Sequence, residues 1–473
     1  ETMDFDNTIL CKLGKFFATV TPETLPPQVM AKSRRVLADF LVALAVGYQE
    51  GSVAYAANEY FADLGGKPEA TALGLDRKLP AVNAALLMGT MAHSIELDDG
   101  HRWGTSHPSV SVVPAALAIA ERDGRSFPEL LTAIAVGYDG MLRPARSVNP
   151  QHLDRGFHST GTCGSLGAAA AAANLLGLGP TEIAYAISLG GLQSAGLCEM
   201  LHDQPGIKTI QPGKAAQSGV LAADLVARGV TSPRTLMEGR HGWLSAMCDN
   251  VYSLSGIIGE LGERWEIMYN YIKLYPTCRH CHATIDLARE ARQALQPDLS
   301  EIESISVRLY RVGYVEVALV KHPTTFEEAM FSLPFAVAIA LKTGNVTLQD
   351  YTPENIADEQ LYAIADMVDV QIDEEMNAVY PEERGSKFRM KMRDGREFYK
   401  AVPVAKGEPE TPVSDEELMA KHEAMLRPYY APEFVTGLWD IVVNRKLDSV
   451  NYSDVVEHFG RFHTPCRRET SAS

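Results

Sequence analysis

The stretch from His93 to Pro108 gathers acids and histidines more densely than the rest of the sequence. Six of its side chains can exchange protons or bind cations: His93, Glu96, Asp98, Asp99, His101 and His107. Carboxylates beside histidines shift one another's pKa values, which can create a general base that works near neutral pH. The stretch follows an apolar helical run and ends at a proline, so we expect a helix end and a turning loop. We place the centre of the chemistry here.

Two other interpretations of this stretch stay open. A solvated helix end would use the same side chains only to hydrogen-bond backbone groups, although the interleaved Gly and Trp residues disfavour it. A Zn²⁺ or Fe²⁺ site is the second interpretation, but His93 and Glu96 form the only pair at helical ligand spacing. We therefore expect no metal ion.

A second group of candidate residues lies in Arg155-Gly-Phe-His158-Ser-Thr-Gly-Thr-Cys-Gly, directly before an Ala-rich run. Ser, Thr and Gly favour a helix N-terminus, whose backbone N–H groups attract carboxylates. His158 is the candidate proton carrier; the alternative is a histidine that only caps or packs at the helix start. A dinucleotide-binding loop is disfavoured because no strand precedes the glycines.

Lysines that can bind a carboxylate occur in two further segments. Lys208 and Lys214 lie in a loop punctuated by Gly and Pro, where they either bind an anion or face solvent. This loop lacks the GxxxxGK[ST] pattern of a phosphate-binding loop. Lys273 and Tyr275 lie where the composition of the chain changes, at an expected domain junction, and anionic ligands often bind at such junctions.

The same junction contains Cys278-Arg-His-Cys281-His282, which has two further interpretations. Haem c attachment is typical of exported proteins, and we see no basic region followed by an apolar core near Glu1. A structural zinc site would need a second ligand pair at matching spacing, and none is apparent. Seven scattered cysteines do not indicate a disulfide framework, so we expect reduced thiols and a cytoplasmic protein.

The overall charge limits the partners. With 43 basic and 60 acidic residues the formal net charge is −17, which disfavours nucleic acid and anionic membrane surfaces. The same field repels an anionic substrate, so a carboxylate site needs a local group of basic side chains. His107, His158, Lys208 and Lys273 are the candidates for that group.

Hydrophobic patterning predicts the elements that position these residues. Ala-, Leu- and Gly-rich blocks of helical length dominate 26–225, among them 30–45, 80–97 and 113–121, and the run from Gly164 predicts a central buried helix. Strand-type alternation appears in 302–310 and in 387–393, where Asp394-Gly395 predicts a hairpin. We expect a mainly α fold: a large all-helical domain from both chain ends (1–270 and 406–473), with a smaller inserted α+β lid domain (271–405).

The ordered set of motifs resembles the MmgE/PrpD family, which includes 2-methylcitrate dehydratase, cis-aconitate decarboxylase and iminodisuccinate epimerase. The motifs that carry the resemblance are Leu97-Asp-Asp with His107-Pro-Ser, Gly156-Phe-His, the Ala-rich run, Lys208 with Gly213-Lys-Ala-Ala, and Lys273-x-Tyr-Pro. The resemblance implies a helical domain with an α+β lid, a homodimer, an active site in the cleft between the domains, and catalysis without a cofactor.

Position by position, the resemblance places a decarboxylase-type site on Glu96, Gly100, His107, His158, Lys208, Lys273 and approximately Leu319. That subgroup has aspartate at the position of Glu96, threonine at that of Gly100 and tyrosine near Leu319. A shifted alignment would put Tyr314 in place of the tyrosine. The subfamily therefore stays open.

The expected function is a lyase acting on a small di- or tricarboxylate of the citrate or aconitate type. His107 or His158 would remove the proton next to a carboxylate, while Lys208 and Lys273 stabilise the enolate-like charge. Supporting roles fall on Glu96, Asp99 and His101 in positioning and proton delivery, and on Lys214 and Tyr275 in substrate binding. The alternatives are an epimerase that uses the same proton abstraction and a non-catalytic ligand-binding protein.

Overall fold

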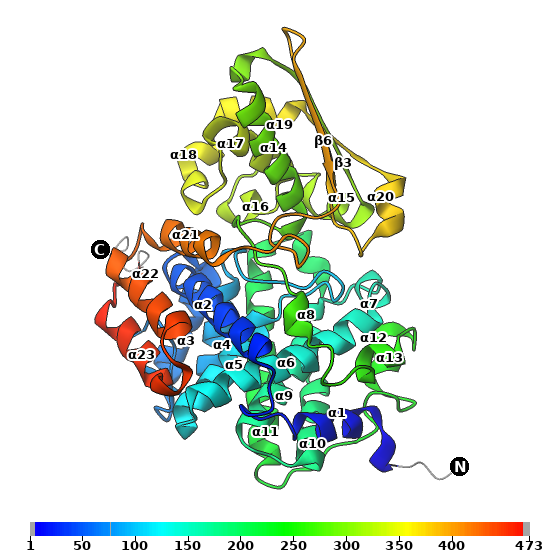
Figure 1. Cartoon of the computed structure of the whole chain (residues 1–473), viewed down its shortest axis with the longest axis vertical. Coiled ribbons are helices and arrows are strands. Elements are labelled where there is room, and N and C mark those ends of the chain that lie inside the picture. Colours follow the sequence, from blue (N-terminus) through cyan, green and yellow to red (C-terminus); the bar gives the residue numbers. More distant parts are fainter. Residues whose placement is uncertain (1–4, 76, 467–473) are drawn as a thin grey trace. The chain divides into compact units, whose positions relative to one another are not determined.

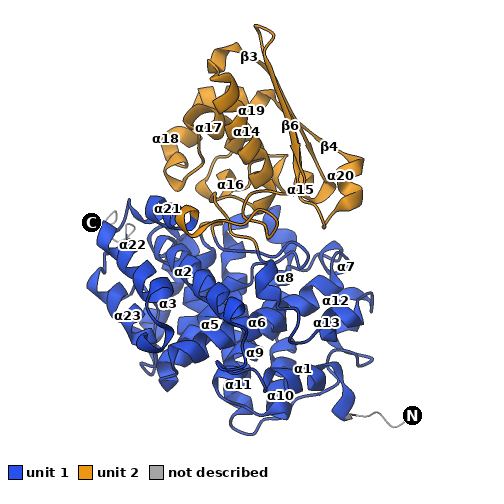
Figure 2. Cartoon of the chain, in the orientation of Figure 1, with its two compact units in different colours: residues 1–94, 98–270, 418–473 blue, residues 95–97, 271–417 orange. Residues whose placement is uncertain are grey.

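The computed structural model describes residues 5–75 and 77–466. This part of the chain is mainly helical with small sheets, as predicted (Figure 1). The chain forms two compact units: unit 1 comprises 1–94, 98–270 and 418–473, and unit 2 comprises 95–97 and 271–417 (Figure 2). Glu1, at the start of the segment considered for an export signal, lies outside the described residues.

Unit 1 is built from helices that pack on helices. The helices that pack most extensively against one another are α2 (Pro27–Glu50), α4 (Ala81–His93), α5 (Ser109–Asp123), α6 (Phe127–Val148), α9 (Gly164–Leu175), α10 (Pro180–Gly191) and α11 (Ile210–Val226). Its other described α-helices up to residue 270 are α1 (Ile9–Phe17), α3 (Ser52–Leu64), α7 (Gln151–Asp154), α8 (Ser159–Thr162), α12 (Trp243–Cys248) and α13 (Leu254–Ile258). The helices expected in 30–45, 80–97 and 113–121 are confirmed as α2, α4 and α5, although α4 ends at His93.

The Ala-rich helix α9 is buried as predicted and packs against α5, α6, α10 and α11. Small side chains let neighbouring backbones approach it. A Cβ atom on Gly167 would lie 2.6 Å from the carbonyl oxygen of Gly137 in α6, and one on Gly219 of α11 would lie 2.4 Å from Ala168 Cβ. The composition of this helix therefore sets how closely the surrounding helices pack.

Gly167→Ala should destabilise the protein by about 1–3 kcal/mol, because the added methyl would also lie 2.5 Å from Met141 Cβ and force a shift of α6. Chemical denaturation measures this change. The matched control is Gly460→Ala in α23 (Tyr452–Arg461), where nothing lies within 4 Å of the added Cβ atom. The control should be neutral or stabilise by up to about 1 kcal/mol; equal losses in both variants would contradict the packing argument.

Unit 1 also contains a short antiparallel strand pair, β1 (Ala70–Thr71) and β2 (Lys78–Leu79), so the expectation of an all-helical domain is incomplete. Strands of two residues are too short to produce a recognisable alternation. The pair is held to α5 by Glu121, whose carboxylate accepts hydrogen bonds from the Thr71 backbone N–H at 2.7 Å and the Thr71 hydroxyl at 2.7 Å.

The segment 418–473 belongs to unit 1, and its described part is helical. It contains most of α21 (Asp415–Leu426), then α22 (Pro432–Trp439) and α23. Ser414 caps the start of α21: its hydroxyl accepts the Glu417 backbone N–H at 3.1 Å, and its own N–H donates to the Glu417 carboxylate at 2.8 Å. Lys421 Nζ contacts Asp39 Oδ1 of α2 at 2.7 Å, so a buried ion pair ties this segment to the N-terminal part of unit 1.

Unit 2 contains a four-stranded sheet in the order β4-β3-β5-β6. The strands are β3 (Ile302–Leu309), β4 (Val368–Ile372), β5 (Ser386–Met392) and β6 (Glu397–Val402). The alternating segments are confirmed as β3 and β5, and the predicted hairpin is the antiparallel pair β5–β6, with Gly395 at φ +88° in its turn. Strand β4, which pairs parallel with β3, was not anticipated because a parallel neighbour comes after a long connection.

The helices of unit 2 are α14 (His282–Leu295), α15 (Arg311–Val317), α16 (Phe326–Ala329), α17 (Leu333–Thr343), α18 (Pro353–Ile356), α19 (Glu359–Met367) and α20 (Glu374–Val379). Helix α14 packs on β5 and β6 and against α17, which packs against α19. These three helices lie on the same side of the sheet in Figure 1.

None of the single helices within 5–75 and 77–466 combines the length and apolar composition needed to cross a bilayer. The bent pair α2 and α3 meets those criteria only when both helices are counted together, across a bend of 81°.

Candidate active site

The acid- and histidine-rich stretch forms the connection between α4 and α5. Helix α4 ends at His93 and α5 begins at Ser109, so the intervening residues are released from helical geometry. Glu96 and Thr105 adopt φ values of +50° and +46°, in the left-handed region that non-glycine residues rarely occupy. Backbone strain of this kind is common where a loop must hold functional side chains in place.

Asp98 links two histidines of unit 1. Its carboxylate lies 3.0 and 3.1 Å from Nδ1 of His93, and one of its oxygens lies 3.4 Å from Nδ1 of His107. The two imidazole rings have their centroids 5.0 Å apart. His93 and Asp98 are fully buried, whereas 14% of the His107 side chain is exposed. His107 is therefore the member of this trio that a ligand can reach.

The surroundings of His107 fix the position of its ring proton. Nδ1 lies 2.8 Å from the backbone carbonyl oxygen of Asp99, which can only accept, so Nδ1 carries the proton and the neutral ring has its lone pair on Nε2. The backbone N–H of His107 donates to the Thr160 hydroxyl at 3.1 Å. This bond joins the loop to the second group of candidate residues.

Asp99 was predicted as a catalytic residue, and the structure shows what its side chain contacts. The buried carboxylate accepts hydrogen bonds from the Ser109 N–H at 3.1 Å, the Tyr138 hydroxyl at 2.6 Å and the Asn270 amide at 2.6 Å. Burial raises the pKa of Asp99, although these hydrogen bonds act in the opposite direction. Asp99 thus meets His107 through its backbone carbonyl, and Asp98 is the acid whose carboxylate faces the histidines.

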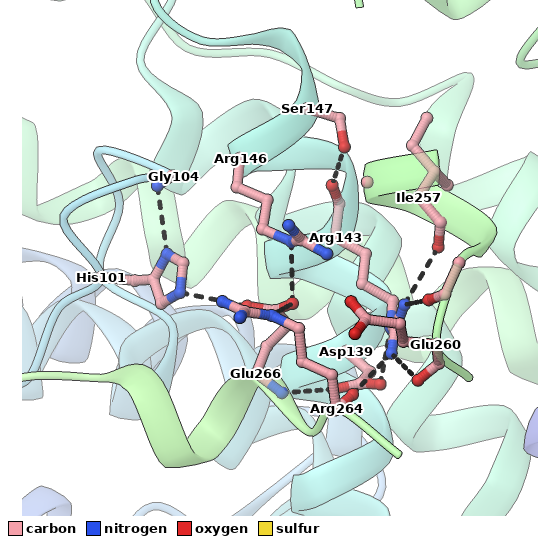
Figure 3. Close-up of polar contacts among 12 residues, drawn as sticks. His101, Gly104, Asp139, Arg143, Arg146, Ser147, Ile257, Glu260, Arg264 and Glu266 are labelled. Atoms are coloured by element: carbon pink, nitrogen blue, oxygen red, sulfur yellow. Dashed lines mark hydrogen bonds and ion pairs between the residues drawn. The ribbon is translucent and has the colours of Figure 1, made fainter. Parts of the chain in front are cut away.

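His101, the other predicted catalytic residue of the loop, is fully buried in a separate polar network (Figure 3). Its Nδ1 accepts the Gly104 backbone N–H at 3.1 Å, and its Nε2 lies 3.2 Å from Glu266. Arg146 and Arg264 contact the other oxygen of Glu266 at 2.8 and 2.9 Å. Burial alone would raise the pKa of Glu266, but His101 and the two arginines lower it to about 2. These contacts hold the His101 ring inside the fold.

The second candidate histidine, His158, lies just before α8 and is almost completely buried. Its Nδ1 lies 2.5 Å from the Gln211 side-chain oxygen, and its backbone N–H donates to the Gly196 carbonyl at 3.1 Å. Gln211 lies in the first turn of α11, which directly follows the short helix η3 (Pro205–Thr209) with the buried Lys208. Within unit 1, Thr160 thus contacts the His107 backbone and Gln211 contacts the His158 ring. No sequence signal indicated that either residue would hold a candidate histidine.

His152, close to His158 in the sequence, gives unit 1 a pH-dependent stability. Its buried ring contacts the Met247 carbonyl at 3.0 Å and the Thr162 hydroxyl at 2.6 Å, and burial lowers its pKa to about 4. The unfolded chain binds a proton near pH 6.5 and the folded chain does not, so stability falls as pH decreases from about 6.5 to 4, by up to about 3 kcal/mol. Denaturation at pH 7 and pH 4.5 tests this, and a His152→Gln variant should lose this part of the dependence.

Lys214 was predicted to bind substrate, and the structure places it on the exposed face of α11. Its Nζ donates to Gln217 Oε1 at 3.0 Å, one turn along the same helix. Lys208 is buried, so the two lysines of this segment face different surroundings. The geometry favours Lys208 as the functional lysine, and substrate binding by Lys214 stays a prediction.

Unit 2 contains the other predicted lysine in a buried ion pair. Lys273 Nζ lies 2.9 Å from the Glu96 carboxylate and 3.1 Å from the Glu96 backbone carbonyl. Lys273 is fully buried and Glu96 nearly so. The contact with Glu96 holds the buried ammonium group of Lys273 in a fixed position. The segment 95–97 belongs to unit 2 although it continues directly into Asp98.

Tyr275 is buried in unit 2, where its hydroxyl donates to Asp286 at 2.6 Å and accepts from Arg289 at 2.8 Å. Burial raises the pKa of the Tyr275 hydroxyl above its normal value. These contacts favour a structural role, and its role in substrate binding stays a prediction. Of the two positions considered for a lid tyrosine, Leu319 is 64% exposed and Tyr314 is half-buried within α15.

Comparisons with known proteins add an independent observation. The model of the MmgE/PrpD N-terminal domain matches residues 11–253, and that of the MmgE/PrpD C-terminal domain matches residues 275–444. Similar proteins include a cis-aconitate decarboxylase of Homo sapiens, 26% identical over 89% of this chain and 88% of its own length. Others are a cis-aconitate decarboxylase of Aspergillus terreus (22%, covering 92% of each chain) and the cis-aconitate decarboxylase-like protein oryM of Aspergillus oryzae (23%, covering 88% and 90%).

Proposed function

Because the chain belongs to the MmgE/PrpD family, we propose that it is a cofactor-independent lyase acting on a small di- or tricarboxylate of the citrate or aconitate type. The names of its relatives support lyase chemistry, since they are cis-aconitate decarboxylases. None of these names supports the epimerase alternative. A homodimer and a cytoplasmic location stay predictions.

The observation that carries the proposal is the environment of His107. Nδ1 is held by the Asp99 carbonyl and faces the Asp98 carboxylate, so Nε2 is the basic atom of a ring whose side chain is partly exposed. Asp98 stabilises the imidazolium that forms when Nε2 takes a proton. A ring with a fixed tautomer and a nearby carboxylate is suited to abstract a proton from a carbon next to a carboxylate.

His158 is the proposed second proton carrier. Its Nδ1 is held by the Gln211 side chain, as that of His107 is held by a carbonyl, so both rings present Nε2 as the reactive nitrogen. In dehydration, one histidine takes the α-proton and the other protonates the departing hydroxide. In decarboxylation, the bond to the carboxylate breaks with release of CO₂, and a histidine in its protonated form donates a proton to the resulting carbanion.

The two buried lysines are the proposed carboxylate partners. Lys208 is proposed because it lies three residues before Gln211, which contacts His158. Lys273 is proposed because it forms an ion pair with Glu96, and one residue separates Glu96 from Asp98 in the chain. Fixed ammonium groups stabilise the negative charge that develops on a substrate carboxylate. Asp99 and His101 act as positioning residues in this proposal.

The test is incubation with cis-aconitate, citrate and 2-methylcitrate in deuterated water, followed by NMR and by CO₂ detection. We expect loss of water or CO₂ from at least one acid, and EDTA should leave turnover unchanged. Deuterium exchange without either product would contradict the lyase and favour the epimerase. Absence of both exchange and product for every acid would favour the ligand-binding alternative.

A further inference from the structure

Three side chains of unit 2 outside the proposed lyase residues bring metal-ligand atoms together. Cys278, His280 and Glu316 each offer one ligand atom, and all three atoms lie within 4.8 Å of one another. His280 Nε2 is 3.3 Å from Glu316 Oε2, and Cys278 Sγ is 3.7 Å from the same oxygen. Cys278 and His280 are buried and Glu316 is partly exposed.

The fold places these residues by close packing of α15 on the segment around η5 (Arg279–Cys281). The Cys278 backbone N–H donates to the Met330 carbonyl at 2.8 Å, which anchors the segment. A Cβ atom on Gly313 would lie 3.1 Å from the Tyr310 ring and 3.5 Å from His280 Cβ, so the missing side chain lets α15 approach. Glu316 follows Gly313 by three residues and therefore lies on the same helix face.

Two of the three separations between the ligand atoms are close to those of a tetrahedral zinc site, and the sulfur–nitrogen separation is within 4.8 Å. Zinc binds N and O ligands at about 2.0–2.2 Å and S at about 2.3 Å, which separates neighbouring ligand atoms by about 3.3–3.6 Å. The observed N–O and S–O separations of 3.3 and 3.7 Å agree with these values. Small side-chain rotations would place all three atoms on one ion.

The surroundings of His280 favour its role as a ligand. Its Nδ1 contacts the Tyr310 hydroxyl, which orients the ring so that Nε2 faces Glu316. Tyr310 is itself held by stacking on Tyr380, with ring centroids 5.0 Å apart.

We infer that Cys278, His280 and Glu316 form a binding site for a divalent cation of the zinc type. The thiol of Cys278 releases its proton to solvent as the sulfur binds, and the thiolate and the Glu316 carboxylate then balance the two charges of the ion. Three protein ligands leave a fourth position for water or another oxygen ligand. No second closely spaced ligand pair marks this site in the sequence, because its third ligand comes from α15, about 40 residues away.

Cobalt(II) titration of the full-length protein tests this inference, after treatment with chelator and reduction of the thiols. We expect one equivalent to bind, with sulfur-to-cobalt charge-transfer absorption, and Zn²⁺ to displace it. Cys278→Ser should abolish the charge-transfer band, and Glu316→Gln should weaken binding at least about tenfold. The matched control, Cys281→Ser, removes a buried thiol outside the trio and should retain both.

Binding of less than one equivalent by the unaltered protein would overturn the inference, as would a spectrum that Cys278→Ser leaves unchanged. Should Cys278→Ser fail to fold by circular dichroism, Glu316→Gln decides the question, because Glu316 is partly exposed. An unchanged affinity in that variant would also overturn the inference. The titration contains no substrate, so its outcome is independent of the proposed lyase activity.

Discussion

His107→Gln should lower kcat by at least about 100-fold with little change in the free energy of unfolding. Glutamine can still donate a hydrogen bond to the Asp99 carbonyl, which His107 Nδ1 contacts at 2.8 Å, so the loop keeps that interaction. An amide cannot accept the substrate proton. Steady-state kinetics on the best substrate, with thermal unfolding of the same samples, measures both quantities.

The control for this substitution is His322→Gln, which changes an exposed histidine of unit 2 that contacts Asp366. Its kcat should remain within about twofold of the unaltered enzyme. A loss of less than about threefold in His107→Gln would contradict the assignment of His107 as the base. If His158→Gln then lost more than about 100-fold, the base would be His158.

The chemistry of the loop was easier to predict than the role of each residue. Composition alone located the stretch between His93 and Pro108, and the structure places it between α4 and α5. Asp98 and Asp99 are adjacent and identical, yet one faces two histidines and the other is bound by Ser109, Tyr138 and Asn270. In an irregular loop, no period relates a residue's position in the sequence to the direction of its side chain. The direction is set by tertiary partners such as Asn270, which binds Asp99.

A similar limit applies to residues that act from distant segments. Glu266 and Gln211 hold His101 and His158 from positions 165 and 53 residues further along the chain, and no local pattern marks either residue. The helices and strands were more predictable, because burial of one face imposes a period on the sequence. The exceptions are the two-residue strands β1 and β2, which are too short to show a period, and the parallel strand β4, whose partner is distant in the chain.

Arg143→Met should destabilise the protein by about 3–5 kcal/mol, the largest stability effect we expect. Arg143 is fully buried in α6, where its Nε lies 2.7 Å from Asp139. Its terminal nitrogens donate to the backbone carbonyls of Ile257, Gly259, Glu260 and Arg264 (Figure 3). Methionine fills similar space and leaves the carboxylate and the four carbonyls without their donor. Urea denaturation measures the loss.

Arg146→Met is the matched control, because Arg146 lies in the same helix and contacts Glu266 at 2.8 Å but is partly exposed. Glu266 keeps His101 and Arg264 in that variant, so the loss should be about 1 kcal/mol. Adding Asp139→Asn to Arg143→Met should restore part of the stability, since the buried carboxylate is then neutral. Equal losses of stability from Arg143→Met and Arg146→Met would show that the four carbonyl contacts contribute nothing.

The backbone segment that Arg143 holds leads to Asn270, and Asn270 binds Asp99. Arg143→Met should therefore also reduce turnover.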